Sequence, residues 1–411
     1  MSGCHVVDSG VSRILGSRED QEDRYIALHP GSLKSRKELA LFAVYDGHGG
    51  SEAVNHVSQN FVTHLEQHFG KPKESTPEAY HLAIQRALKA VDRDLDRADL
   101  SGGSTVALVL IDTKQGILVQ ANLGDSHVVY ADHLPESQSP TTGSGSSDSP
   151  IDDDLPTGWS VETLSEEHAP DSPAEKKRIE EAGGEINYGT GIARIGAVNM
   201  SRALGDIDYK KPRVNRLAGH NLSDLPGVET GLAPGASAKH DLVSNKAHFA
   251  TRHLHGQSLI LLASDGVGDA KDAEEVTRLA VDRWKQGVSA AVIAKELTSR
   301  EGKMRGADNC TVIVVILDTE KKGRRSRSDS MRASLEIPDI EGSGSRRRRR
   351  SSIAKIKDWI QTVHFLFLRQ SSIFYNAKHF IHGTCGFGAP FAGLKSPGYI
   401  TLTSNEILEL A

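Results

Sequence analysis

Between residues 11 and 318, short apolar runs of strand length alternate with stretches of helical periodicity, and this alternation limits the possible folds more than any other feature. The runs are rich in Val, Ile and Leu, as in strands that are buried inside a protein, and amphipathic stretches follow several of them. We expect strands at 40–45, 106–111, 117–123, 128–130, 258–263 and 311–317. We expect helices at 51–69, 76–95 and 171–184. The sequence therefore predicts buried strands that pack against helices.

Two stretches depart from this alternation. Residues 136–157 are dominated by Ser, Gly, Pro, Asp and Thr, which is typical of a mobile surface insertion. After residue 318 the periodicity stops and a Ser/Arg-rich sequence follows. We therefore expect one domain over 1–320, a basic disordered segment over 321–352, and a C-terminal extension of unknown structure over 353–411.

Charge is distributed unevenly along the chain. The formal net charge is −5, yet residues 321–352 hold eleven Lys and Arg against four Asp and Glu, so the rest of the chain is acidic. An acidic body argues against nucleic-acid binding. For the basic segment, the sequence leaves open a solvated tail without a partner, or contacts with kinases, import receptors or anionic surfaces.

Several classes of protein receive no support from the sequence. The three cysteines are widely spaced, so they predict neither a disulfide framework nor a zinc site. The start of the chain lacks the pattern of a secretory signal, and no apolar run approaches the ~18 residues of a membrane span. We therefore expect an intracellular protein, in the cytoplasm, the nucleus or both, without a transmembrane segment and monomeric.

Acidic residues lie at the ends of predicted strands. Asp46, Asp125 and Asp265 each follow such a strand and adjoin a glycine, and Asp308 precedes the last one. At any single place, ordinary turn chemistry is the simpler interpretation. Four carboxylates gathered at one edge of a sheet would repel one another unless a cation lay among them, and oxygen ligands favour Mg²⁺ or Mn²⁺ over zinc. We therefore expect a divalent cation where these carboxylates meet.

A further cluster near the N-terminus contains Arg18, Glu22 and Asp23. Arg18 and Glu22 have the spacing of an exposed helical ion pair, and the spacing alone favours that interpretation. The alternative is that Arg18 clamps phosphate oxygens beside one more acid of a metal site. His48, two residues after Asp46, is a candidate proton donor to a leaving group, although a lone histidine is more often structural.

Taken in order, nine motifs resemble those of the metal-dependent type 2C Ser/Thr protein phosphatases. The motifs are Arg18 with Glu22 and Asp23, Asp46–Gly50, Gly103–Thr105, Ala121–Ser126, Leu164–Pro170, Glu175–Gly184, Ser201–Asp206, Ala263–Asp269 and Asp308–Val314. The resemblance implies an α+β fold, a four-layer α/β/β/α sandwich in which two packed antiparallel β-sheets are flanked by helices. It makes residues 1–320 the catalytic domain.

The resemblance also implies phosphoprotein substrates and two Mg²⁺ or Mn²⁺ ions. Asp46 resembles the carboxylate that bridges both ions, and Gly47 contributes its carbonyl. Asp265 and Asp308 resemble the remaining ligands of one ion, and Glu22 resembles the acid that holds the other, largely through water. Phosphoserine and phosphothreonine would be hydrolysed by direct attack of a metal-bridging hydroxide, without a phosphoenzyme.

Four more positions take a role from the resemblance. Arg18 resembles the phosphate-binding arginine, and His48 the general acid. Asp125 and Asp269, together with Asp265, match the place where some members hold a weaker third ion.

The chain departs from the family pattern at two positions. It has Gly268 where many members have Trp, and His127 where an Arg commonly follows Gly-Asp-Ser. The first change threatens local packing more than chemistry, because a large ring is lost rather than a ligand. Two alternatives to the phosphatase stay open: a pseudophosphatase that binds phosphoproteins without turnover, and a metal-dependent hydrolase of small phosphoesters.

Overall fold

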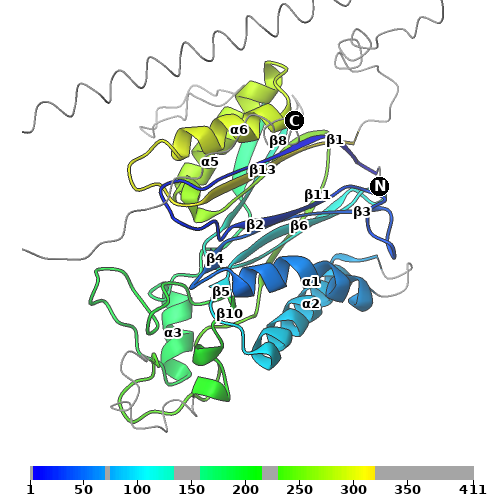
Figure 1. Ribbon diagram of the computed structural model, residues 1–411. Helices are drawn as coiled ribbons and strands as arrows, with labels where there is room; N and C mark the ends of the chain where they lie inside the picture. The colour runs from blue at the N-terminus through cyan, green and yellow to red at the C-terminus, as the bar shows by residue number, and fades with distance from the viewer. Residues whose placement is uncertain (1–2, 70–74, 134–157, 215–229, 320–411) are drawn as a thin grey trace, which may run out of the picture. The chain divides into compact units, whose positions relative to one another are not determined.

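The computed structural model describes residues 3–69, 75–133, 158–214 and 230–319 of the chain. The predicted insertion at 136–157 and the predicted segments 321–352 and 353–411 lie outside the described residues. Two antiparallel β-sheets lie face to face in the described part, and helices cover the outer side of each (Figure 1). The predicted four-layer α/β/β/α sandwich is confirmed.

Among the described residues, each of the two large sheets has five strands. In spatial order the first consists of β1 (His5–Ile14), β13 (Cys310–Asp318), β12 (Gln257–Ala263), β8 (His127–His133) and β9 (Trp159–Thr163). The second consists of β11 (His248–His253), β7 (Ile117–Leu123), β6 (Val106–Asp112), β3 (Leu39–Tyr45) and β2 (Arg24–Leu28). A small third sheet consists of β10 (Leu204–Gly205), β5 (Gly103–Ser104) and β4 (Gly47–His48).

The helices form the two outer layers. The second sheet is covered by α1 (Glu52–His68) and α2 (Pro77–Ala98), and the first by α5 (Ala270–Lys285) and α6 (Ala290–Glu301) (Figure 1). The connections contain α3 (Pro173–Glu181) and the short 3₁₀ helices η2 (Ile207–Tyr209) and η4 (Asp265–Val267). The predicted helices 51–69, 76–95 and 171–184 correspond to α1, α2 and α3.

Strand β3 explains why the predicted strands are unbroken apolar runs rather than alternating patterns. All of its residues are buried. Leu41 and its alternate neighbours pack with α1 residues such as Phe61, whereas Phe42 faces the first sheet and packs with residues such as Ile260. Because successive side chains point to opposite faces, a strand covered on both sides needs apolar residues at every position.

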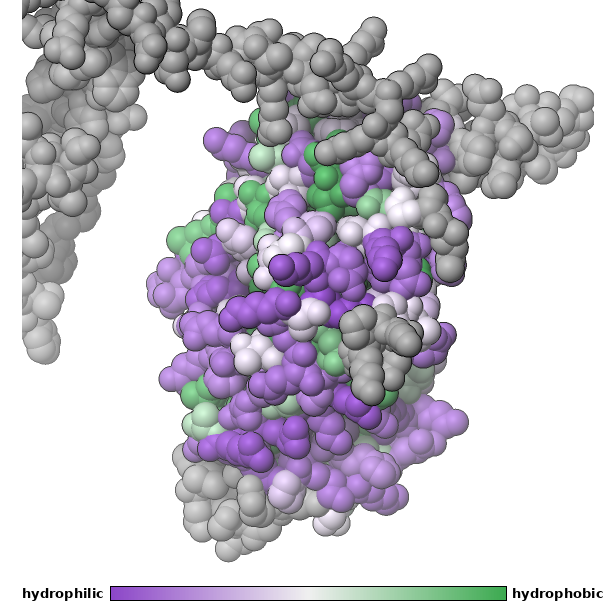
Figure 2. Space-filling model, turned by 90° about the vertical axis from the view of Figure 1, so that its right-hand side faces the viewer, coloured by the Kyte–Doolittle hydropathy of each residue, from purple (hydrophilic) through white to green (hydrophobic). Residues whose placement is uncertain are grey.

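The outer surface has a different character. The face shown in Figure 2 is mostly hydrophilic, with single apolar side chains scattered over it. Such scattered residues are ordinary on a folded protein. Among the described residues, no helix combines the length and the apolar character that crossing a membrane requires.

Candidate active site

Strand pairing in the second sheet brings two of the predicted acidic turns together. Leu123, the last residue of β7, lies opposite Val106, the first residue of β6, and β6 in turn starts beside the end of β3. Asp46 directly follows β3, and Asp125 lies two residues after β7. Both carboxylates therefore lie at the same edge of this sheet.

Pairing in the first sheet brings the other acidic turns to that edge. Ala263, the last residue of β12, lies opposite His127, the first residue of β8, and the end of β12 also pairs with the start of β13. Asp265 follows β12, Asp308 precedes β13, and Asp125 precedes β8. Asp125 thus lies in the connection between the two sheets, and all four predicted carboxylates gather at one edge of the sandwich.

A threonine ties the first two turns to each other. The Oγ1 of Thr105 accepts a hydrogen bond from the backbone N–H of Asp46 at 3.1 Å and lies 2.7 Å from the Oγ of Ser126. The Thr105 N–H donates to the Asp46 carbonyl at 2.9 Å. Because Thr105 and Ser126 are buried, these bonds are shielded from water and hold the two turns in fixed relation.

A buried aspartate ties the other two turns to each other. One carboxylate oxygen of Asp23 accepts hydrogen bonds from the hydroxyls of Ser264 at 2.9 Å and Thr311 at 2.6 Å. Ser264 directly precedes Asp265, and its Oγ also accepts the backbone N–H of Thr311 at 2.9 Å. Asp23 therefore joins the Asp265 turn to the start of β13, beside Asp308.

The N-terminal cluster reaches the same edge. The Glu22 N–H donates to Asn309 Oδ1 at 2.7 Å, and the Glu22 carboxylate accepts the N–H of Gly50 at 2.8 Å. Arg18 forms an ion pair with Asp308, and its side chain is 56% exposed. The segment around Arg18 is not helical, so the predicted helical ion pair between Arg18 and Glu22 is wrong. Arg18 pairs with Asp308 because the fold brings these remote residues together, and local spacing along the chain cannot show such a contact.

Burial and neighbouring negative charges disfavour the ionised carboxylates at this edge. Burial, and then the charges of Asp265 and Asp23, raise the pKa of Asp46 well above its ordinary value. Burial, followed by the charge of Asp265, raises the pKa of Asp125 to about 7. Burial also raises the pKa of Asp23 to about 6, although the hydrogen bonds from Thr311 and Ser264 act in the opposite direction. The ionised forms thus lack a sufficient positive counter-charge.

This donor set fits hard divalent cations. Its ligands are carboxylate and carbonyl oxygens, which suit Mg²⁺ or Mn²⁺. A cation would favour the ionised form of Asp46, which burial and then the neighbouring charges disfavour. In the ranges that the structure describes, no three Asp, Glu, His or Cys side chains are arranged as a ready-made metal cage. The residues that would supply the oxygens are Glu22, Asp46, Gly47, Asp265 and Asp308.

His48 lies in β4 and is paired with an aspartate from another part of the chain. Its Nε2 lies 2.8 Å from Oδ2 of Asp206. A Cβ at Gly103 would lie within 2.5 Å of this Nε2 and of the Asp206 carboxylate, so the pair requires a glycine beside it. Burial lowers the pKa of His48, but the charge and hydrogen bond of Asp206 outweigh it and raise the pKa.

A buried ion pair holds the segment that carries Asp206. Asp92 in α2 accepts hydrogen bonds from the N–H of Gly205 at 2.9 Å and from Lys210 Nζ at 2.7 Å. The Lys210 ammonium also donates to the Ala203 carbonyl at 3.0 Å. Asp206 itself adopts a left-handed backbone conformation with φ of 49°, which aspartate tolerates better than most residues. Helix α2 thereby positions the partner of His48.

Asp269 has a different immediate role. It is the N-cap of α5, where its side chain accepts the backbone N–H groups of Lys271 and Asp272 at 2.7 and 3.1 Å. These hydrogen bonds lower the pKa of the Asp269 carboxyl. Its predicted part in a third ion site stays a prediction.

Three positioning residues had no role in the predictions from sequence: Asp23, Thr105 and Asp206. Each lies within one of the quoted motifs, so the motif order contained a signal for them. The partners described above include residues 21 to 288 positions away in the chain, so spacing alone does not reveal these contacts.

His168 contacts the Asp125 turn, and its shifted pKa predicts that the stability of the protein depends on pH. It is fully buried, and its Nδ1 accepts the Gly124 N–H at 3.1 Å. Burial, and then the charge of Arg202, lower the pKa of His168 from 6.5 to about 4. The unfolded chain therefore binds an additional proton between these values, so stability decreases as the pH falls from about 6.5 to 4. The loss amounts to about 3 kcal/mol.

Urea unfolding of wild type and His168→Asn across this pH range measures that loss. Asparagine keeps an acceptor near the position of Nδ1 but cannot be protonated, so the wild type should lose stability relative to the variant on acidification. Parallel pH profiles for the two proteins would contradict the expectation.

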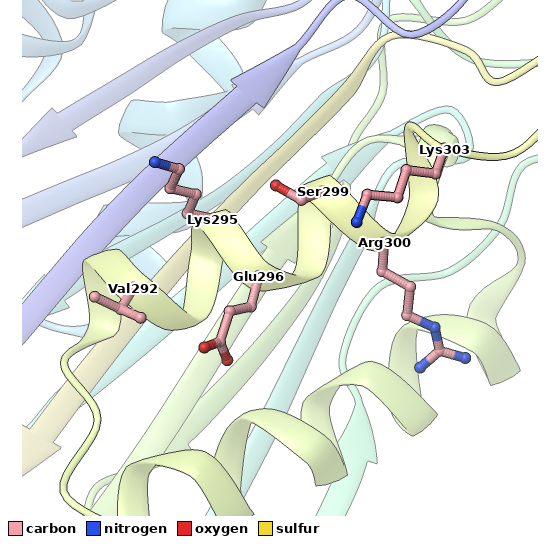
Figure 3. A pocket seen from close by; sticks show the side chains of 6 residues that line it. All are labelled: Val292, Lys295, Glu296, Ser299, Arg300 and Lys303. Atoms are coloured by element: carbon pink, nitrogen blue, oxygen red, sulfur yellow. The ribbon is translucent and has the colours of Figure 1, made fainter. Parts of the chain in front are cut away.

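One pocket of the described residues is not lined by any of these carboxylates. It has a volume of about 500 Å³ and runs along α6, with the side chains of Val292, Lys295, Glu296, Ser299, Arg300 and Lys303 around it (Figure 3). A second pocket of about 290 Å³ is lined by Asp265, Gly268 and Asp308, among others. The second pocket adjoins the acidic edge, whereas the first contains none of the predicted site residues.

Known proteins resemble this chain over the region that contains the site. The sequence profile of the family Protein phosphatase 2C matches residues 7–310. The chain is 28% identical over 316 residues to bovine Protein phosphatase 1L, which covers 74% of this chain and 71% of that protein. It is 30% identical over 325 residues to Protein phosphatase 2C 1 of Paramecium tetraurelia, which covers 74% of this chain and 91% of that protein.

A solved structure shares the fold. The crystal structure of serine-threonine phosphatase 2C from Toxoplasma gondii superposes with a TM-score of 0.54 at 20% identity, covering 77% of this chain and 100% of that chain. The family profile spans well over half of the chain and includes all the acidic turns described above. The chain is therefore a member of the protein phosphatase 2C family.

Proposed function

We propose that this protein serine/threonine phosphatase hydrolyses phosphoserine and phosphothreonine by direct attack of water on phosphorus, with Mg²⁺ or Mn²⁺ ions at the acidic edge and without a phosphoenzyme. The observation that carries the proposal is the convergence of the Asp46, Asp125, Asp265 and Asp308 turns at one edge of the sandwich. The protein phosphatase family assignment supports the same reaction class.

Asp46 would hold both ions together with the Gly47 carbonyl, Asp265 and Asp308 would be further ligands of one ion, and Glu22 would hold the other. When bound, the ions make water acidic enough to act as a nucleophile near neutral pH and offset charge on the phosphoryl group. Glu22 is kept in place by its bonds to Gly50 and Asn309. A weaker third ion would be held by Asp125 together with Asp265 and Asp269.

Arg18 would bind the phosphate of the substrate. Its side chain is more than half exposed and forms an ion pair with Asp308, so it is accessible at the acidic edge. A planar guanidinium can donate two parallel hydrogen bonds to phosphate oxygens and can neutralise equatorial charge as the bond to the leaving oxygen breaks.

His48 would protonate the departing serine or threonine oxygen. A carboxylate such as Asp206 only accepts hydrogen bonds, so the Nε2 of His48 carries the proton of their bond. Within the described residues, the Nδ1 of His48 has no hydrogen-bond partner. Nδ1 is therefore the atom at which the transferable proton would be held. The raised pKa of His48 favours the protonated form that a general acid needs.

A phosphothreonine peptide assay with the full chain tests the proposal. We expect phosphate release that requires added Mn²⁺ or Mg²⁺ and stops with EDTA. Binding of the peptide without turnover under all metal conditions would instead support the pseudophosphatase alternative. Turnover of a small phosphoester without turnover of the peptide would support a small-molecule hydrolase.

A further inference from the structure

The two departures from the family pattern, His127 and Gly268, are in direct contact. The Nε2 of His127 lies 3.0 Å from the carbonyl oxygen of Gly268. A carbonyl only accepts, so His127 is the donor and its Nε2 carries a hydrogen. His127 is only 3% exposed and Gly268 is half-buried, so the donor side of the bond is shielded from water.

The Gly268 peptide is held from both sides. Its N–H donates to the Asp265 carbonyl at 2.7 Å, while its own carbonyl accepts from His127. Gly268 has φ of +114°, and a Cβ there would lie 2.1 Å from Oδ2 of Asp272. The same Asp272 carboxylate accepts the N–H of Asp269 at 3.0 Å. The turn from Asp265 to Asp269 is thus closed by short, directed contacts, one of which comes from His127.

This bond completes a series of links between the acidic turns. Thr105 and Ser126 join the Asp46 turn to the Asp125 turn, and Asp23 joins the Asp265 turn to the start of β13. His127 lies two residues after Asp125, and Gly268 three residues after Asp265. Their hydrogen bond adds a side-chain link between the Asp125 turn and the Asp265 turn, beside the backbone pairing of Ala263 with His127.

We propose that His127 is a positioning residue for the metal centre of this enzyme, and that it acts by tying the turn of Asp265 to the turn of Asp125. The inference rests on the proposed function, because it concerns the affinity for the ions assigned there. His127 touches none of the proposed ligand oxygens. Replacing a residue that orients metal ligands without binding the metal itself typically lowers the metal affinity by about 10- to 100-fold.

Calorimetric titration of the full-length, metal-free protein with Mn²⁺ tests the proposal. We expect His127→Ala to bind Mn²⁺ about 10-fold more weakly than wild type. His127→Gln should bind within about 3-fold of wild type, because its amide nitrogen can occupy the place of Nε2 and donate to Gly268. In activity assays the alanine variant should need more Mn²⁺ for half-maximal rate, yet approach the wild-type kcat at saturation.

His133→Ala is the matched control, because His133 is an exposed histidine at the far end of the same strand, β8. It should bind Mn²⁺ like wild type. If His127→Ala does not fold, the Mn²⁺ affinities of His127→Gln and His127→Asn are compared instead, because the shorter asparagine cannot reach Gly268. If wild type and the variant that lacks the hydrogen bond to Gly268 (His127→Ala, or His127→Asn) bind Mn²⁺ equally well, the positioning role of His127 is overturned and the proposed function is not. Absence of Mn²⁺ binding by wild type overturns the proposed function as well.

Discussion

Replacement of Asp46 by asparagine is expected to lower phosphopeptide hydrolysis at least about 1,000-fold, equivalent to about 4 kcal/mol of activation free energy. Asp46 is the one residue proposed to hold both ions, and burial, followed by the charges of its acidic neighbours, raises its pKa. An amide oxygen is a neutral and weaker ligand, so the variant should fail to retain the ions. Initial rates at saturating Mn²⁺ measure the effect.

The melting temperature of the metal-free variant provides the control for folding. Removing one charge from a group of mutually repelling carboxylates should leave the metal-free stability unchanged or higher. In the presence of Mn²⁺, the melting temperature should rise for wild type and stay constant for Asp46→Asn. An Asp46→Asn protein that keeps more than a tenth of the wild-type rate would show that the bridging role is assigned to the wrong residue.

Loss of the His48 proton should depend on the leaving group. We expect His48→Gln to slow hydrolysis of a phosphothreonine peptide by about 100-fold, because an alkoxide leaves only with a proton. An aryl phosphate with a nitrophenolate leaving group needs no such help, so its hydrolysis should fall much less. Parallel kcat measurements with the two substrates separate proton donation from any general damage to the site.

Asp206→Asn should reproduce a part of this pattern, with about a 10-fold loss on the peptide and little loss on the aryl phosphate. Asparagine tolerates the left-handed backbone that Asp206 adopts, so the substitution removes charge with little strain. Asp94→Asn, which removes a similar pairing between a carboxylate and His64 on the helical surface, serves as the control. Equal losses on both substrates would refute the orienting role of Asp206.

The apolar runs predicted the inner strands well, because these strands are covered on both faces. Every residue of β3, β6 and β7 is buried, so these strands are nearly continuous apolar runs in the sequence. Strands β1 and β2 were not predicted, since their residues are mostly half-buried and mix polar with apolar side chains. Helices α5 and α6 were likewise not predicted, although Asp269 and Asp272 form a capping box at the start of α5.

The acidic turns were identified from the sequence as candidates, and the order of the motifs supported the family. Arg18 shows where local reasoning fails: four-residue spacing to Glu22 favoured a helical pair, whereas the folded chain places Arg18 against Asp308. The pairing of His48 with Asp206 likewise joins residues 158 positions apart. Hydrogen bonds across such separations depend on how remote connections meet in the folded chain, which the spacing within one segment does not show.

By itself, the sequence determined which residue types stand at the strand ends, which segments are apolar enough for a core, and to which family the ordered motifs are similar. These properties are local or depend only on order along the chain. The tertiary structure decided which turns meet, which hydroxyls and imidazoles link them, and how burial and neighbouring charges shift each pKa. Such properties depend on distances between residues remote in the chain, and antiparallel pairing sets those distances only once both sheets have formed.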